Sequence, residues 1–305
     1  MTLQTNQKPS WLRVKLPGGD QHHDIKRNLR EKKLFTVCEE AKCPNLGECW
    51  SSGTATLMIL GEVCTRGCRF CAVQSGDPKG WLDPLEPQKC ADTVKAMNLK
   101  YVVLTCVDRD DLPDGGAGQF AAVIQAIQRE APQCLIEVLT SDYQGDFAHV
   151  QVVLDAKPDV FAHNVETVRE LTPRVRDPRA GYDQSLRVLE YAKSVDSRRI
   201  IKTSLMLGLG ETESQVHQAM RDMRAVGVDV LTLGQYLRPT RKHLAVQEYL
   251  SPEKFDAYAD VARDLGFLYV ASGPLVRSSY KAGEFFLANY LARERAQAVR
   301  PVWEV

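Results

Sequence analysis

The sequence has no net charge, no long hydrophobic run and no apolar segment near its start. Its 39 Lys and Arg residues balance 39 Asp and Glu residues, which argues against a surface built throughout to bind nucleic acid or anionic lipid. No stretch approaches the roughly 18 apolar residues of a membrane span, and residues 1–8 lack the hydrophobic core of a secretory signal. We therefore expect a soluble, cytoplasmic protein with no nucleic-acid or membrane partner.

Most of the chain alternates between two kinds of segment. Of 305 residues, 44% are hydrophobic and 26% are charged, which is typical of a globular protein with a sizeable core. Short apolar runs predict strands, and longer segments with helical spacing predict helices between them. The strands are expected at 56–60, 101–105, 135–139, 159–163, 200–205 and 230–234, and the helices at 88–97, 117–130, 182–194, 212–226 and 252–265.

Six such alternations predict a parallel sheet and hence an α/β fold. No Gly-x-Gly-x-x-Gly opening follows any of these strands, which favours a partial (β/α)6 barrel of the TIM type over a doubly wound sheet. Active sites of such barrels lie at the carboxyl ends of the strands. We expect the barrel over residues 56–270, between an N-terminal extension over 1–55 and a C-terminal extension over 271–305.

The first 35 residues carry a local excess of positive charge. They contain eight Lys or Arg residues and three acidic residues. This pattern is typical of a solvated, flexible arm, and it also suits a docking surface for an acidic partner.

The cysteines give the strongest signal in the sequence. There are nine, an odd number, and no export signal accompanies them, which disfavours a disulfide framework. Six of the nine cysteines form two closely spaced triplets: Cys38, Cys43 and Cys49, and then Cys64, Cys68 and Cys71. Two such triplets side by side indicate metal ligands.

The second triplet has the spacing Cys-x-x-x-Cys-x-x-Cys and follows the first expected strand. Gly67 permits a tight turn within it, so the three thiolates can surround one face of a small cluster. Three ligands on a [4Fe–4S] cluster leave one iron open for chemistry. The alternative is a structural zinc site with a fourth ligand from elsewhere, although the chain lacks the paired Cys-x-x-Cys arms usual in such sites.

This triplet, with Phe70 beside its last cysteine, resembles the cluster motif of the radical S-adenosylmethionine superfamily. The resemblance implies that the open iron binds S-adenosylmethionine, which one electron then cleaves to a 5′-deoxyadenosyl radical. The segment Gly208-Leu209-Gly210-Glu211, at the end of the fifth expected strand, resembles the part of that superfamily that contacts adenine. A simple turn between strand and helix explains these glycines equally well.

Further segments narrow the resemblance to the lipoyl synthase family, over residues 9 to 286. They are the two triplets together, Phe35-Thr36-Val37-Cys38, Asp108-Arg109-Asp110-Asp111, His163-Asn164-Val165-Glu166-Thr167 and Arg277-Ser278-Ser279-Tyr280. The resemblance implies that Ser279 completes the ligands of a second [4Fe–4S] cluster held by the first triplet. Asn164 and Glu166 stand at the end of the fourth expected strand, the expected active-site edge, where we expect them to contact the methionine or ribose part of S-adenosylmethionine. A turn residue at 164 and a first helical turn at 166 are equally compatible with the sequence.

The family's activity, taken as an implication of the resemblance, is a sulfurtransferase reaction. Two sulfur atoms enter at C6 and C8 of an octanoyl chain on a lipoyl carrier protein, either an H protein or a 2-oxoacid dehydrogenase E2 lipoyl domain. The second cluster is consumed as the sulfur source. Ferredoxin or flavodoxin is the implied reductant, and an iron–sulfur carrier is needed to repair the cluster. A radical is required because no side-chain base can deprotonate an unactivated C–H bond.

Two other functions remain open at this point. In one, the protein is a different radical enzyme whose second cluster only transfers electrons; in the other, it is a non-enzymatic iron–sulfur or zinc protein. Six expected strands are more scaffold than an electron carrier needs. Among the remaining polar residues, Lys202 and Arg176 could bind a carboxylate or form ion pairs, and His163 and His217 lack metal-ligand spacing.

Overall fold

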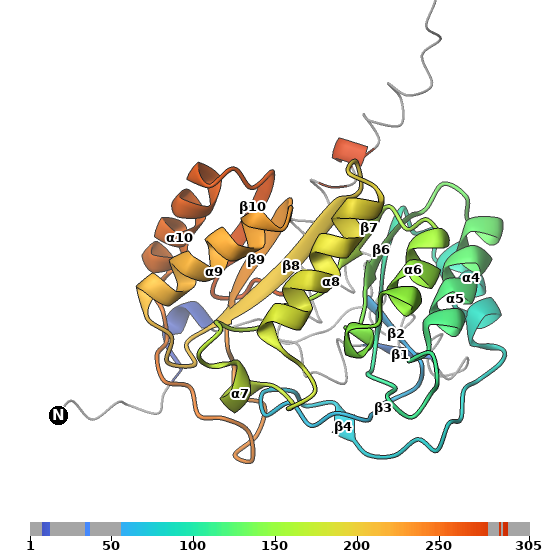
Figure 1. Ribbon diagram of the computed structural model, residues 1–305, viewed down its shortest axis with the longest axis horizontal. Helices are drawn as coiled ribbons and strands as arrows, with labels where there is room; N and C mark the ends of the chain where they lie inside the picture. The colour runs from blue at the N-terminus through green and yellow to red at the C-terminus, as the bar shows by residue number, and fades with distance from the viewer. Residues whose placement is uncertain (1–7, 13–33, 37–55, 280–286, 288, 292–305) are drawn as a thin grey trace, which may run out of the picture.

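One sheet forms the frame of the molecule (Figure 1). The structure is a computed structural model that describes residues 8–12, 34–36, 56–279, 287 and 289–291. Seven parallel strands neighbour one another in the order β2 (Thr56–Ile59), β5 (Tyr101–Cys106), β6 (Leu135–Leu139), β7 (Val160–Ala162), β8 (Ile200–Leu207), β9 (Val230–Gln235) and β10 (Tyr269–Gly273). A short β1 (Phe35–Thr36) pairs antiparallel with β2. The sheet therefore has β1 and β10 as its edges, as expected for a partial barrel.

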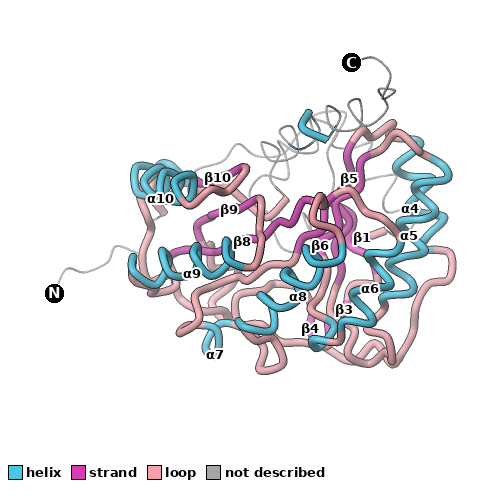
Figure 2. Tube along the Cα trace, turned by 45° about the horizontal axis from the view of Figure 1, so that its top comes forward, coloured by secondary structure: helices cyan, strands magenta, loops and turns pink. Residues whose placement is uncertain are grey.

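Helices cover the outer face of this sheet, as Figures 1 and 2 show. They are α4 (Glu86–Ala96), α5 (Ala117–Glu130), α6 (Phe147–Asp155), α8 (Tyr182–Val195), α9 (Glu213–Ala225) and α10 (Pro252–Asp264), with the short α7 (Thr172–Val175) and the 3-10 turns η1 (Ser10–Leu12) and η2 (Tyr143–Gly145). The apolar face of α5 is buried in the main core, and a capping box at Thr212 begins α9. In the described part of the chain, no helix is long and apolar enough to span a membrane.

The inner face of the sheet is filled by alternate residues of the parallel strands. Near the amino ends of the strands, side chains from five strands pack around the fully buried Leu287. Above this layer, the Lys202 ammonium lies 2.7 Å from a carboxylate oxygen of Glu137, and the Tyr101 hydroxyl donates to the other oxygen. In the described part of the chain, these two layers fill the interior near the amino ends of the strands.

The structure confirms all six predicted strands and the five predicted helices, and it contains elements that the sequence pattern did not reveal. α6 was not predicted because its Val-rich run favours a strand, but the Asp146 carboxylate accepts the Ala148 N–H and caps a helix there. β10 is short and only partly buried, and it spans the expected boundary at residue 270. The short β3 (Val63–Cys64) and β4 (Gln74–Ser75) also pair outside the main sheet.

The buried ion pair gives a test of this interior. Lys202→Met should lower the free energy of unfolding by about 3–5 kcal/mol, because it leaves the Glu137 carboxylate buried without its cation. The double variant Lys202→Met with Glu137→Leu should recover most of the loss. Urea denaturation of the three proteins measures the difference. A single variant within about 1 kcal/mol of wild type would contradict this account of the pair.

Candidate active site

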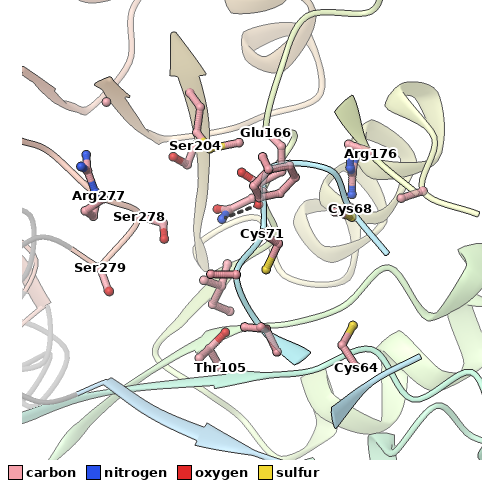
Figure 3. Close-up of a pocket in the computed structure, with 18 of the residues that line it drawn as sticks. Cys64, Cys68, Cys71, Thr105, Glu166, Arg176, Ser204, Arg277, Ser278 and Ser279 are labelled. Atoms are coloured by element: carbon pink, nitrogen blue, oxygen red, sulfur yellow. Dashed lines mark hydrogen bonds between the residues drawn. The ribbon is translucent and has the colours of Figure 1, made fainter. Parts of the chain in front are cut away.

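A cavity of about 530 Å³ opens at the carboxyl ends of the parallel strands. Its wall includes residues from the ends of β5, β6, β7, β8 and β9, together with two segments outside the sheet (Figure 3). One is the cysteine loop, residues 64–71, and the other is the serine segment, residues 276–279. The predicted site residues Cys64, Cys68, Cys71, Phe70, Asn164, Glu166 and Ser279 all line this cavity. As predicted, the cysteine loop lies where barrel active sites lie.

The cysteine loop has little secondary structure, so contacts with distant segments hold its backbone. The Thr65 N–H donates to the carbonyl of Asp108 after β5 at 2.9 Å. On the other side, Nε2 of His243 donates to the carbonyl of Cys71 at 2.8 Å. These contacts fix both ends of the loop relative to the barrel.

Asp177, beyond α7, holds the middle of the loop. Its carboxylate accepts the Gly67 N–H at 2.8 Å, and its own N–H donates to the sulfur of Cys68 at 3.3 Å. The neighbouring Arg179 guanidinium keeps the pKa of the Asp177 carboxyl well below its usual range. The carboxylate therefore stays ionised and continues to accept the Gly67 N–H at acidic pH.

The three thiols of the loop are free and partly enclosed. Burial raises the pKa of Cys64 and of Cys68 to about 11, and that of Cys71 to about 12. At neutral pH, these side chains become thiolates only when a cation such as iron binds them.

The chemistry of the donors suits an iron–sulfur cluster. Cysteine thiolates are the usual protein ligands of a [4Fe–4S] cluster, and each binds a different iron. The donor set of Cys64, Cys68 and Cys71 at the cavity wall therefore fits the cluster that the sequence predicts. Within the described ranges, no group of three or more His, Cys, Asp or Glu side chains is placed to hold a single metal ion.

A buried charge network lies behind the loop. The Arg66 side chain is almost fully buried and pairs with Asp110 and Asp142, each at 2.8 Å, and with Asp108 at 3.4 Å. Burial raises the pKa of Asp108 to about 6, and one of its carboxylate oxygens lies 3.8 Å from the Cys64 sulfur. Sequence reasoning gave these residues no role, although the run of acids beginning at Asp108 was a signal.

Glu166 follows β7 and has a strained backbone with φ of 73°, in the left-handed region. Two backbone hydrogen bonds with β8 hold it there, one to the Ser204 carbonyl at 3.0 Å and one from the Met206 N–H at 2.8 Å. The Asn164 amide donates to its carboxylate at 3.1 Å, and burial raises the pKa of Glu166. Glu166 is therefore held at the cavity wall by a bridge to β8 and does not begin a helix.

Arg176 is another of the cationic residues that line the cavity. Its Nη1 donates to the Ser185 hydroxyl at 2.7 Å, and that hydroxyl lies 2.9 Å from Nε2 of His163. Nδ1 of His163 donates to the Thr140 carbonyl, so Nε2 accepts, and burial lowers the pKa of the ring to about 4. His163 is thus a neutral structural residue, as predicted. Nε of Arg176 is buried and has no hydrogen-bond partner among the described residues.

Lys202 differs from Arg176 because it does not line the cavity. Its ammonium is bound to Glu137 in the barrel interior. Of the two cations that the sequence left open, Lys202 is therefore the ion-pair residue.

The serine segment forms the wall opposite the cysteine loop (Figure 3). It crosses β9 at Gly234, where a Cβ atom would lie 2.1 Å from the carbonyl oxygen of Val276. Only glycine leaves room for this approach, which brings Ser278 and Ser279 to the cavity.

The other predicted residues are placed differently. Gly208 and Gly210 have φ of 98° and 110° and form the turn after β8, where the Glu211 carboxylate accepts two backbone N–H groups, but neither lines the cavity. Cys106 lines the cavity, whereas Cys90 and Cys134 are buried in the core. Three predicted ligands, Cys38, Cys43 and Cys49, lie outside the described residues.

Solved structures with a similar fold are distant in sequence. The FeFe-hydrogenase maturase HydG from Carboxydothermus hydrogenoformans has a TM-score of 0.53 at 13% identity, over 89% of this chain and 78% of that one. Another structure of a HydG maturase has a TM-score of 0.57 at 13% identity, over 82% of this chain and 63% of that chain. At this identity the likeness shows the fold alone, and it supports the partial barrel.

Sequence comparisons identify the family. A model of the radical SAM superfamily matches residues 58–223, and a model of the N-terminal domain of lipoyl synthase matches residues 2–43. The lipoyl synthase of Thermus thermophilus is 58% identical over 92% of this chain and 87% of its own. The lipoyl synthase of Marinobacter nauticus is 55% identical over 93% of this chain and 82% of its own length. The mitochondrial lipoyl synthase of Candida albicans is 57% identical over 94% of this chain and 75% of its own length. This chain belongs to the lipoyl synthase family of the radical S-adenosylmethionine superfamily.

Proposed function

We propose that this protein inserts two sulfur atoms at C6 and C8 of an octanoyl chain carried by a lipoyl carrier protein, forming the lipoyl cofactor. One observation carries the proposal: the cysteine loop and Ser279 lie on opposite walls of one cavity. A radical source on one wall and a sulfur source on the other would face the same bound chain, as the proximity of reacting groups requires.

The residues divide between two [4Fe–4S] clusters. Cys64, Cys68 and Cys71 hold the first, which binds S-adenosylmethionine. Cys38, Cys43 and Cys49 hold the auxiliary cluster with Ser279, which assigns this cluster to the extensions 1–55 and 271–305 and the first cluster to the barrel 56–270. When bound, the first cluster with S-adenosylmethionine supplies a radical that removes hydrogen from carbon, and the auxiliary cluster supplies sulfur.

The chain's own groups suit the S-adenosylmethionine part of this site. The unpartnered Nε of Arg176 suits the methionine carboxylate, and the Glu166 carboxylate, held by Asn164, suits the amino group or the ribose hydroxyls. Phe70, which lines the same cavity, would contact the bound cofactor. Gly208 and Gly210 would contribute through the turn that they form after β8.

The remaining wall of the cavity suits a hydrocarbon chain. Met58, Leu139 and Met206 are among the apolar residues that line the cavity. Burial of each methylene contributes about 0.8 kcal/mol, so an octanoyl chain gains several kcal/mol from an apolar wall of this kind. Exclusion of water also protects a carbon radical from side reactions.

The partners are larger than this cavity, so they must dock around its mouth. The basic section over residues 1–35 is one candidate surface, and it lies almost wholly outside the described residues. Within the described chain, the cysteine loop, α7 and the loop after β9 carry exposed cations that form no ion pair with a described acid. They are Arg69, Arg174, Arg238, Arg241 and Lys242.

We call these five exposed cations, Arg69, Arg174, Arg238, Arg241 and Lys242, the basic rim, and we propose that an acidic lipoyl carrier protein docks on it. Ferredoxin or flavodoxin as reductant, an iron–sulfur carrier for cluster repair and a cytoplasmic location complete the proposal.

The central test is turnover with a minimal substrate. Anaerobic incubation with an octanoyl-lysine peptide, S-adenosylmethionine and a strong reductant should convert the peptide to the dithiolated product, detected by mass spectrometry. Cys68→Ala should abolish both this product and 5′-deoxyadenosine, because the first cluster loses a ligand. Formation of 5′-deoxyadenosine without sulfur in the peptide, and with intact iron content, would indicate a different radical enzyme whose second cluster only transfers electrons.

Ser279→Cys tests the sulfur source. A thiolate holds iron more firmly than the harder serine oxygen, so the auxiliary cluster should persist while its breakdown slows or stops. The expected result is full iron and sulfide content with at least tenfold less dithiolated peptide. Ser278→Cys provides the matched control at the neighbouring position. Normal turnover by Ser279→Cys would show that a weak oxygen ligand is not needed.

The basic rim predicts a salt-dependent interaction. Arg241→Glu combined with Lys242→Glu should raise the KM for an octanoylated carrier protein roughly three- to tenfold at low salt and much less at 0.5 M salt, because ions screen surface charges. The KM for the octanoyl-lysine peptide should not change. Arg198→Glu, at the opposite end of the strands and 94% exposed, is the control. An equal rise in KM for the peptide and the carrier protein would show that the basic rim does not act by docking the carrier protein.

A further inference from the structure

A buried threonine contacts the serine that we assign to the auxiliary cluster. Thr56, at the start of β2, is only 4% exposed, and its hydroxyl lies 3.0 Å from the Ser279 hydroxyl oxygen. We propose that Thr56 is a positioning residue that orients Ser279 and stabilises its iron-bound, anionic form. This inference rests on the ligand role of Ser279 given under the proposed function.

The direction of the hydrogen bond supports this role. Thr56 donates and Ser279 accepts, so the bond does not use the proton that Ser279 must lose when it binds iron. A donor that already points at the oxygen would make a stronger, charge-assisted bond to the anion. No reorientation of Thr56 is needed when the ligand forms.

The two partners differ in how they are held. Thr56 belongs to the parallel sheet, where it pairs in register with Val103, and its β-branched side chain has few rotamers. Ser279 lies in the serine segment beyond β10, and the bond from Thr56 is the one side-chain hydrogen bond that it makes with the described chain. The sheet therefore fixes the position of the donor, and the donor fixes the serine oxygen.

Partial burial explains why such a donor matters. Ser279 is half-buried, so an oxygen anion there loses part of the hydration that would stabilise it in water. A hydrogen bond from Thr56 replaces part of that stabilisation. Groups that hydrogen-bond to metal ligands typically contribute 10- to 100-fold to metal affinity, which sets the size of the expected effect.

The experiment measures loss of iron from the auxiliary cluster alone. The full-length chain with Cys64, Cys68 and Cys71 all changed to Ala cannot hold the first cluster, so iron bound by this parent reports the auxiliary cluster. Thr56→Val, Thr56→Ser and Ser279→Ala are each added to it. Thr232→Val is the control, because Thr232 is a buried barrel threonine whose hydroxyl bonds to a backbone carbonyl away from the cavity. Iron release to a chelator is followed anaerobically, together with Mössbauer spectra.

Thr56→Val should release iron at least about tenfold faster than the parent. Thr56→Ser keeps the hydroxyl donor, so its rate of iron release should equal that of the parent. The control Thr232→Val should also release iron at the rate of the parent. Adding Thr56→Val to Ser279→Ala should have little further effect, because Thr56 acts through Ser279. If Thr56→Val does not fold, Thr56→Ala removes the hydroxyl without the second methyl group and replaces it in the comparison.

Two results separate the possible failures. If Ser279→Ala holds iron as well as the parent, the ligand role of Ser279 is wrong, and the proposal for Thr56 falls with it. If Ser279→Ala loses iron while Thr56→Val retains it with an unchanged Mössbauer spectrum, Ser279 remains a ligand and only the role of Thr56 is overturned.

Discussion

The site depends on how one irregular loop is held in place. The cysteine loop has almost no secondary structure, yet its thiols must keep fixed positions if they are to bind one cluster. Asp177 meets this requirement from more than a hundred residues away, because its carboxylate accepts the Gly67 N–H and its backbone N–H reaches the Cys68 sulfur. Contacts at Asp108 and His243 hold the two ends. The loop is therefore positioned by the carboxyl ends of the barrel rather than by its own conformation.

The surroundings of the thiols suit binding by a cation. Burial makes bare thiolates unfavourable at all three cysteines. Two cationic groups at the cavity wall are engaged with other residues: Arg66 is paired with three carboxylates, and Nη1 of Arg176 donates to the Ser185 hydroxyl. A bound cation such as iron would stabilise the thiolates, and Nε of Arg176 has no hydrogen-bond partner among the described residues.

The sequence predicted the frame of the molecule well and its supporting contacts poorly. Six strands were identified because continuous apolar runs are typical of parallel strands covered on both faces. α6 was missed because its valines favour a strand, and a single carboxylate at Asp146 decides the outcome. The cysteine motif predicted the site because its three ligands are local in sequence. Arg66, Asp142 and Asp177 could not be found in the same way, because isolated charged residues carry no periodicity and their partners lie far along the chain.

The close approach at Gly234 has a consequence for natural variation. Every amino acid other than glycine carries a Cβ atom, so any missense change at this position pushes on the Val276 carbonyl. The displaced segment carries Ser279, so under the proposed function such an allele would move the proposed oxygen ligand of the auxiliary cluster. In sequence alone the position resembles an ordinary glycine within a strand.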